Sequence, residues 1–231
     1  MRHIGFGMMV WLLAAWMPCR AAGSPAPDGP RSCVESAVKR QAWAEAEECF
    51  RRWVEQEAGV AARYFETAVS ASLPCRPGMA RRLGERYRQL RDYPRAYAFF
   101  RVWLEHEPRS VDCLLNCAEM KVMGGSEEEA LPYYERVLLL DAENRAANLF
   151  VGNYLFARAE TAYRALKQAY DELASPTKMD YARYRERLGA LVQDEYARAK
   201  AHLMRVASQF RSQGIGRTLE RIRTVEEESR Q

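Results

Sequence analysis

The side chains that most often carry out chemistry are sparse in this sequence. Beyond residue 30 it has two histidines, His106 and His202, and each stands among the charged residues of a predicted helix. Either imidazole could titrate near neutral pH, but we interpret both as surface positions. No nucleophile stands beside a candidate base, and no glycine-rich loop follows a strand. We therefore predict a protein that is not an enzyme and binds no cofactor.

The cysteines could bind metal or form disulfides. Cys113 and Cys117 are four residues apart and share a helical face, but no further ligand stands at metal-binding spacing, so we predict no metal site. We interpret both as small buried residues. Cys33 and Cys49 could bridge two adjacent helices. Together with Cys75 they make an odd number, so at least one thiol stays free unless a partner chain pairs with it; the pairing itself stays open.

The N-terminus is typical of an export signal. Arg2 precedes an apolar run of 14 residues, from Ile4 to Met17, and small residues and a proline-rich stretch follow. The run is shorter than the roughly 20 residues that a membrane-spanning helix needs. We therefore predict an exported protein of the periplasm or cell envelope.

The segment divides into a signal peptide over residues 1–23 and a flexible linker over residues 24–30. The alternative is a lipid anchor on Cys19. Trp16 and Pro18 argue against the anchor, because small residues are expected just before an acylated cysteine.

The charge gives no indication of a nucleic-acid partner. Lys and Arg number 35 against 31 Asp and Glu, which gives a formal net charge of +4. No basic run stands clear of acidic residues. Arginines far outnumber lysines, and we interpret them as solvated helix faces rather than as phosphate ligands.

Beyond residue 30 the apolar spacing is helical throughout, and no stretch alternates as a strand does. Breaks such as the one at Gly124 and Gly125 separate segments of helical length. Ser126 with Glu129 predicts a capping box, and Thr177 with Asp180 predicts its aspartate analogue. The fold is therefore predicted to be all-α.

One stretch of nine residues occurs twice. "CFRRWVEQE" at 49–57 returns as "FFRVWLEHE" at 99–107, so that Phe50 and Trp53 are matched by Phe100 and Trp103. Duplication is the simplest cause. We expect both tryptophans to be buried between repeats.

The segment 77–110 resembles a tetratricopeptide repeat, or TPR, whose period is 34 residues. Two small residues let antiparallel helices approach closely, and large residues fill the groove between them. The positions that carry the resemblance are Leu83, Gly84, Tyr87, Tyr93, Ala96, Phe100 and Pro108. The next 34 residues, 111–144, match through Cys117, Ala118, Ala130, Tyr134 and Val137.

The resemblance implies a TPR-like solenoid of helical hairpins, a right-handed superhelix, over residues 31–213. An apolar stripe predicts one long helix over about residues 145–174. The second-helix pattern returns at 195–210, so we interpret the segment between as a repeat that kept its length and lost its signature. An extra helix at 59–74 explains why the two copies of the nine-residue stretch are 50 residues apart. Residues 214–231 resemble a polar capping helix and tail.

The resemblance also implies a function. The first helices of a TPR array line a concave surface that holds a peptide or another protein. The corresponding positions here are Arg81, Glu85, Arg88, Gln89, Leu115, Glu119, Val122, Leu149, Asn153 and Phe156. Glu85 and Leu149 depart from the lysines and asparagines with which chaperone-type TPRs grip a C-terminal carboxylate, so we do not assign that ligand.

We therefore predict a non-enzymatic TPR scaffold or adaptor that binds a protein or peptide partner. The alternative is a self-associating structural protein of the envelope that uses the long helix and a hairpin rich in tyrosine. Its tyrosines, which we interpret mainly as packing residues, are Tyr163, Tyr170, Tyr181 and Tyr184.

Overall fold

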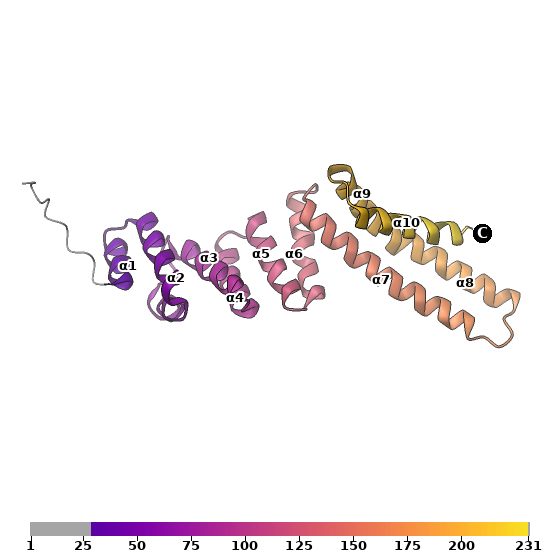
Figure 1. The fold of residues 1–231 in the computed structure, drawn as a ribbon, viewed down its shortest axis with the longest axis horizontal. Helices are drawn as coiled ribbons and strands as arrows, with labels where there is room; N and C mark the ends of the chain where they lie inside the picture. Colours follow the sequence, from indigo (N-terminus) through magenta and orange to yellow (C-terminus); the bar gives the residue numbers. More distant parts are fainter. Residues whose placement is uncertain (1–28, 231) are drawn as a thin grey trace, which may run out of the picture.

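A computed structural model describes residues 29–230, and this part of the chain is helical with short connections. The helices form one elongated array (Figure 1). The predicted signal peptide, Cys19 and nearly all of the predicted linker lie outside the described residues. Within them, none of the helices combines the length and the apolar character that crossing a bilayer requires.

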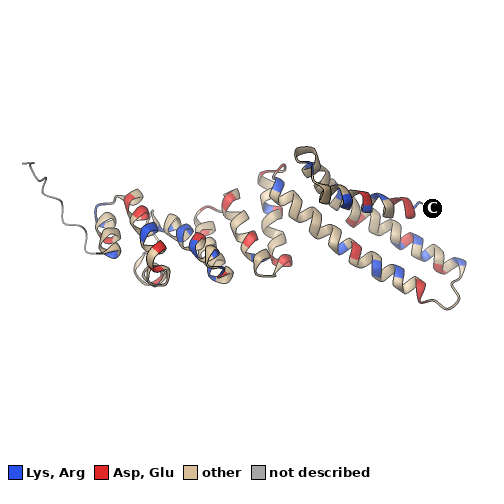
Figure 2. Ribbon diagram, in the orientation of Figure 1, with Lys and Arg blue, Asp and Glu red and all other residues tan. Residues whose placement is uncertain are grey.

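The helices follow one another along the array in chain order as far as residue 171, the later helices fold back beside the long helix that ends there (Figure 1), and acidic and basic residues are interspersed along the array (Figure 2). They are α1 (Pro30–Lys39), α2 (Trp43–Ala68), α3 (Arg76–Gln89), α4 (Tyr93–His106), α5 (Val111–Met123), α6 (Glu127–Leu140), α7 (Arg145–Asp171), α8 (Lys178–Leu191), the π-helical segment η1 (Val192–Tyr196), α9 (Ala197–Gln209) and α10 (Gln213–Glu228).

The turns inside the first three hairpins have the same backbone conformation. Gln41, Arg91 and Gly125 each adopt a left-handed backbone, with φ of 57°, 59° and 78°. In all three turns the next residue donates its N–H to the carbonyl five positions earlier, at 2.9 Å. The spacing of these turns, 50 and then 34 residues, equals the offsets of the sequence repeats. The repeats seen in the sequence are therefore repeats of structure.

The predicted extra helix is present, but its bounds differ. The backbone leaves the helical region at Glu57 (φ −139°, ψ 63°), and the chain then continues as helix to Ala68. The insert is thus the distal part of α2 rather than a separate helix at 59–74. It ends before Pro74 because the backbone extends at Val69 and the Ser70 hydroxyl then accepts the N–H of Ser72.

The predicted long helix is α7, which has 27 residues. After the turn at 172–177, α8, η1 and α9 run back beside it as one continuous helix (Figure 1), since the backbone stays right-handed helical through Leu191, Val192, Tyr196 and Ala197.

The contacts between these helices correct the predicted repeat count. Gly152 on α7 lies against Leu203 on α9, as Gly84 on α3 lies against Phe100 on α4. Gly84 precedes Phe100 by 16 residues and Gly152 precedes Leu203 by 51. The 35 additional residues form a projecting hairpin inside one repeat. The prediction of a separate, degenerate repeat is wrong.

The core runs along the array between the hairpins. Trp53 and Trp103 are buried, with exposed fractions of 3% and 5%, as predicted. Their rings lie 6.2 and 6.4 Å from those of Phe50 and Phe100. Burial of aromatic side chains is a large stabilising contribution, so the twice-used aromatic pattern is a pattern of core packing.

A disulfide joins Cys33 on α1 to Cys49 on α2, which settles the pairing left open by the sequence. Cys75, Cys113 and Cys117 are free and buried. The expectation that Cys113 and Cys117 are small core residues is confirmed.

One of the two predicted helix caps is present. Thr177 and Asp180 form the reciprocal capping box that begins α8. Ser126, before α6, makes no side-chain cap. The carboxylate of Glu129 accepts a hydrogen bond from Lys121 Nζ at 2.6 Å instead, so an ion pair across the turn replaces the predicted box.

Candidate functional site

A pocket of about 440 Å³ lies where the C-terminal ends of α3 and α5 meet the second helices α4 and α6. It contains four of the ten residues that the TPR resemblance implied: Arg88, Gln89, Glu119 and Val122. The pocket is therefore a part of the predicted concave surface that is hollowed enough to hold a side chain.

Two tyrosines give the pocket an aromatic floor. Tyr93 begins α4, and Tyr134 in α6 is buried and stacks on Phe150 with 4.2 Å between ring centroids. Burial, with a smaller contribution from Glu119, raises the pKa of Tyr134 to about 12. Its phenol is thus neutral at physiological pH and presents an apolar ring.

Charge lies at the rim of the pocket. Arg88 on α3 reaches across to α5, where its Nη1 donates to Asn116 Oδ1 at 3.0 Å and stands 3.6 Å from Glu119 Oε2. Val122 is half-buried and Met123 is 58% exposed. The pocket has an apolar floor with a guanidinium and a carboxylate above it. This arrangement suits a peptide that inserts one apolar side chain and whose backbone forms hydrogen bonds with the charged groups.

The remaining predicted residues lie outside this pocket. On α3, Arg81 pairs with Glu85 at 2.9 Å and its guanidinium lies 5.0 Å from the Trp103 ring centroid. Leu115 on α5 is half-buried. The α7 set lies further along the array, with Leu149 and Asn153 exposed and Phe156 edge-on to Tyr196. The structure therefore brings together four of the ten.

Sequence reasoning missed five residues of the pocket. They are Arg91, Tyr93, Met120, Met123 and Tyr134. Tyr93 and Tyr134 were assigned to packing within their hairpins, although their rings also face the pocket. Counting the aromatic positions of the second helices together with the first-helix positions would have found both.

The prediction of a surface position is confirmed for one of the two histidines. His106 is exposed, as expected, whereas His202 is half-buried between α9 and α7, with its Nδ1 2.8 Å from Asn148 Oδ1. Because the Asn148 amide nitrogen donates to the carbonyls of Ala142 and Asn144, its oxygen must be the acceptor, and His202 Nδ1 carries the proton. The prediction of a surface position is wrong for His202, which joins two helices.

The environment of His202 keeps its imidazole neutral. Burial lowers the pKa of His202, and the nearby Arg205 and Arg198 lower it further. Among the described residues, no group of three or more His, Cys, Asp or Glu side chains is placed to hold a metal ion. The hydrogen bond of His202 to Asn148 links α9 to α7.

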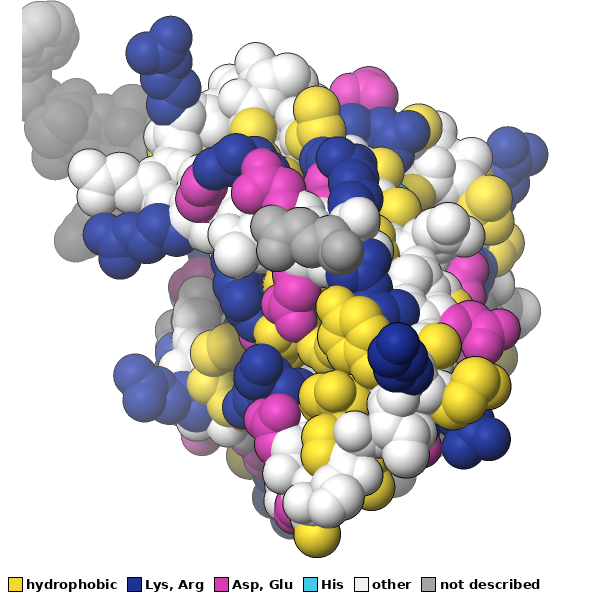
Figure 3. All heavy atoms as spheres, turned by 90° about the vertical axis from the view of Figure 1, so that its right-hand side faces the viewer, with side chains coloured by type: hydrophobic (Ala, Val, Ile, Leu, Met, Phe, Trp, Pro, Cys, Tyr) yellow, Lys and Arg dark blue, Asp and Glu magenta, His cyan; other side chains and the backbone are white. Residues whose placement is uncertain are grey.

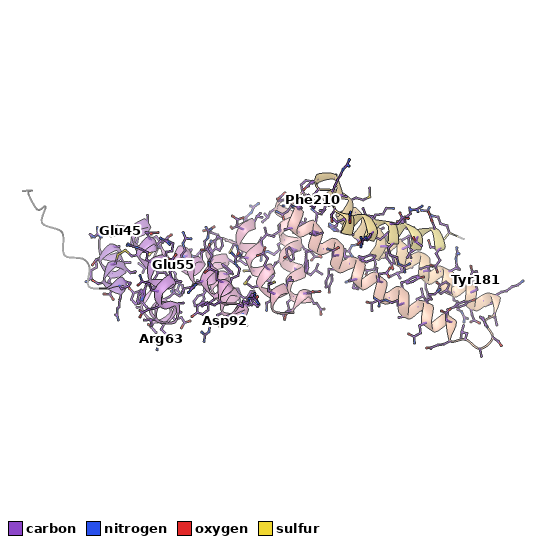
Figure 4. All side chains as sticks on the ribbon, viewed as in Figure 1. Glu45, Glu55, Arg63, Asp92, Tyr181 and Phe210 are labelled. Atoms are coloured by element: carbon purple, nitrogen blue, oxygen red, sulfur yellow. A yellow bond between two sulfur atoms is a disulfide. The ribbon has the colours of Figure 1, made fainter. Side chains whose placement is uncertain are left out.

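The tyrosine-rich hairpin is chiefly a packing device. The hydroxyls of Tyr163 and Tyr184 donate to the two carboxylate oxygens of Glu228 on α10, at 2.8 and 2.7 Å. Tyr181 is 47% exposed and is labelled in Figure 4, where it lies in the outer part of α8. Figure 3 looks onto this end of the molecule, where hydrophobic side chains are surrounded by charged ones.

The repeated left-handed turns, the close glycine contacts and the chain of antiparallel hairpins define an all-α, TPR-like helical solenoid. The chain is similar to the crystal structure of a "putative protein binding protein" from Bacteroides ovatus ATCC 8483. The two are 36% identical over 88% of this chain and 99% of that one, with a TM-score of 0.76. The chain belongs to the same family as this protein.

A thermophilic TPR protein from Thermus thermophilus is also similar, at 15% identity over 85% of this chain and 98% of that one. Its TM-score of 0.33 is too low to support an argument. No protein-family model matches the chain, and no curated protein matches it.

Proposed function

We propose that the protein is a non-enzymatic adaptor that holds a peptide segment of a protein partner in the pocket between α3 and α5. The observation that carries this proposal is the hollow of about 440 Å³ on the surface formed by successive first helices. The Bacteroides relative, a "putative protein binding protein", supports it.

The chemistry of the pocket suggests how the peptide is held. An apolar side chain packs on Tyr93, Met120 and Tyr134, which removes apolar surface from water. Arg88 and Gln89 stand at the rim, where they can donate to backbone carbonyls of an extended chain. Arg88 is already positioned by Asn116, so little side-chain entropy is lost on binding.

We further propose that the protein works in the periplasm or cell envelope. The proposal depends on the signal-like N-terminus. The disulfide between Cys33 and Cys49 supports it, because disulfides persist mainly in oxidising compartments. The intact mass of the mature protein, purified from cells that express the full chain, tests it: removal of about 23 residues is expected, and an uncut N-terminus would contradict export.

The binding proposal is tested by affinity purification of the tagged protein after crosslinking, followed by mass spectrometry. Once a recurrent partner is known, its capture is compared for the wild type and the Arg88→Glu/Arg91→Glu variant, which reverses two charges of the pocket. Capture should fall at least about tenfold, since reversing charges at an interface commonly costs more than 1.4 kcal/mol.

A matched control keeps this experiment specific. Arg211 and Arg217 are exposed residues before and within α10, and Arg211→Glu/Arg217→Glu changes the net charge by the same amount. Capture by this control should equal that of the wild type. Equal capture by both variants would contradict a site at α3 and α5.

The second candidate is self-association through the projecting hairpin. Leu173, Met179 and Tyr181 are 42%, 64% and 47% exposed near its tip, which favours burial against another copy. Light scattering over a range of concentrations tests it. A dimer that dissociates in a Met179→Asp variant would support this function, and a monomer at high concentration would remove it.

A further inference from the structure

The disulfide between α1 and α2 lies beside a hollow at the end of the array that these two helices form. The hollow has a volume of about 540 Å³, and both cysteines line it together with Arg52 and Gln56. It shares no residue with the pocket between α3 and α5. The two cysteines differ in exposure, since Cys33 is half-buried and Cys49 is 2% exposed. A thiol that enters the hollow from solvent therefore meets Cys33 first.

One guanidinium group lies against both sulfur atoms. Arg52 Nη2 is 3.6 Å from Cys49 Sγ and 3.9 Å from Cys33 Sγ. A disulfide sulfur is neutral and accepts hydrogen bonds only weakly, so this contact does little for the closed disulfide. A thiolate carries a full negative charge, and a neighbouring arginine stabilises it. The contact therefore favours the state in which the disulfide has opened.

The carboxylates near the hollow are held by other arginines. Glu45, which lines the hollow and is labelled in Figure 4, accepts a hydrogen bond from Arg40 Nη2 at 2.7 Å. Glu48 accepts two hydrogen bonds from Arg51, at 2.5 and 2.8 Å, and stands 3.9 Å from Arg52 Nε. Among the described residues, Arg52 Nη2 forms its hydrogen bonds with the two sulfurs alone. The guanidinium is thus available to a thiolate at this position.

The first helix has a small packed surface, so its order depends on the disulfide. α1 has 10 residues, of which Val34 and Ala37 are buried. Helices shorter than about 12–15 residues are marginally stable on their own, and α1 therefore needs its attachment to α2. Opening the disulfide removes the covalent part of that attachment and leaves a small apolar contact.

We propose that the disulfide of Cys33 and Cys49 is a site of thiol–disulfide exchange with a dithiol reductant, and that its redox state controls the order of α1. A thiolate of the reductant attacks Cys33 Sγ and forms a mixed disulfide. The bond between the two protein sulfurs breaks, and Cys49 leaves with the electron pair as a thiolate beside Arg52.

The second thiol of the reductant completes the exchange. It loses its proton to solvent and attacks the mixed disulfide at the reductant's own sulfur, so that Cys33 leaves as a thiolate and takes up a proton. The dithiol is oxidised to a disulfide, and its two electrons reduce the protein disulfide to two thiols.

The test follows reduction of the full chain by dithiothreitol at pH 7. Samples are quenched with N-ethylmaleimide, and the peptides that contain Cys33 and Cys49 are quantified by mass spectrometry. Arg52→Gln should slow the loss of the disulfide at least about threefold, because the leaving thiolate loses its cation. Arg52→Lys keeps the charge and should stay within about twofold of the wild-type rate. Arg63→Gln removes the same charge at an exposed position in the distal part of α2 and should react as the wild type does.

Two further measurements distinguish exchange at this site from a general loosening of the hairpin. With glutathione, which has one thiol, the mixed disulfide should be found on Cys33. In a Cys49→Ser variant, the rate of Cys33 alkylation against pH gives the pKa of the Cys33 thiol. That pKa should rise when Arg52→Gln is added, because the thiolate loses its cation.

Hydrogen–deuterium exchange tests the effect on the first helix. Reduction should speed exchange in residues 30–39 and leave exchange in residues 197–209 unchanged. The proposal would be overturned by an equal or faster reduction of Arg52→Gln, by glutathione on Cys49 instead of Cys33, by an unchanged Cys33 pKa in Arg52→Gln, or by unchanged exchange in α1.

Discussion

Gly152 on α7 and Leu203 on α9 are in such close contact that a Cβ atom at Gly152 would stand 2.8 Å from Leu203 Cγ. Gly84 and Phe100 are related in the same way, with 2.6 Å to the ring. The contact is thus preserved although the chain between its two residues is 35 residues longer in the last repeat. A long hairpin has been accommodated without breaking the packing of the repeat that carries it.

Gly152→Ala should therefore destabilise the protein. The added methyl group would overlap Leu203, and overpacking of a tight contact costs about 1–3 kcal/mol. Urea denaturation followed by circular dichroism would measure the change in the free energy of unfolding.

Gly189→Ala provides the control, because nothing lies within 4 Å of a Cβ at that position in α8. Removing a glycine from a helix interior stabilises by about 0.5–1 kcal/mol. Opposite signs for the two substitutions are the expected result. A stabilising Gly152→Ala would show that α7 and α9 do not pack as described.

Trp103→Ala should cost about 3–5 kcal/mol, since it removes a large buried side chain from the core between hairpins. Leu139→Ala is the comparison, because Leu139 is 85% exposed and its loss should change stability by no more than about 0.5 kcal/mol. Both are measured by chemical denaturation. A loss near zero at Trp103 would mean that the helix faces are assigned wrongly.

The stability of the protein should fall as the pH drops below about 6.5. Burial, Arg205 and Arg198 lower the pKa of His202 in the folded state from its ordinary value of 6.5, while Glu135 opposes them weakly. At a pH between the folded and the unfolded pKa of His202, the unfolded chain binds a proton that the folded chain does not. Protonation therefore stabilises the unfolded state relative to the folded state. The loss begins near pH 6.5 and ends below the folded pKa.

His202→Asn should reduce this pH dependence, because an amide in place of Nδ1 can still donate to Asn148 and does not titrate. His106→Asn, at an exposed position, should leave it unchanged. Unfolding curves at a series of pH values between about 5.5 and 8 would decide. An equal slope in wild type and His202→Asn would exclude His202 as its source.

Thiol counting tests the disulfide and the buried cysteines together. Without reductant, an unfolded chain that lacks residues 1–23 should show three reactive thiols, those of Cys75, Cys113 and Cys117, and the folded chain should show none because all three are buried. Reduction should add two and cost about 3 kcal/mol of stability. Five thiols without reductant would contradict the disulfide, and a sixth after reduction would show that Cys19 is retained.

The sequence predicted much of the fold because its strongest signals are local. The spacing of Gly84, Ala96 and Phe100 follows from how two helices must pack, and the absence of breaks after Gly152 was enough to predict α7. The echo between Phe50 and Phe100 also located the inserted helix, though not where it ends, since helix ends depend on side-chain hydrogen bonds such as that of Ser70.

The errors share a cause, which is contact between residues on different helices. The partner of Gly152 is Leu203, which lies in the second-helix pattern at 195–210 but 51 residues away, whereas Gly84 precedes Phe100 by 16. His202 was placed on the surface because its neighbours are charged, yet Asn148 on α7 faces it. Glu129 was predicted to form a capping box with Ser126, but its carboxylate accepts a hydrogen bond from Lys121 on the preceding helix. The sequence identified only four of the nine residues of the pocket for the same reason, because the tyrosines of the pocket come from the second helices.

The most direct test of the proposed function is site-specific photocrosslinking of the full chain in the cells that produce it. Benzoylphenylalanine would replace Gln89 at the rim of the pocket in one variant and Glu105, an exposed residue of α4, in the other. The account predicts that one protein partner is crosslinked from position 89 and not from position 105, and that Arg88→Glu abolishes the product. The same crosslinks from both positions, or none from position 89, would contradict it.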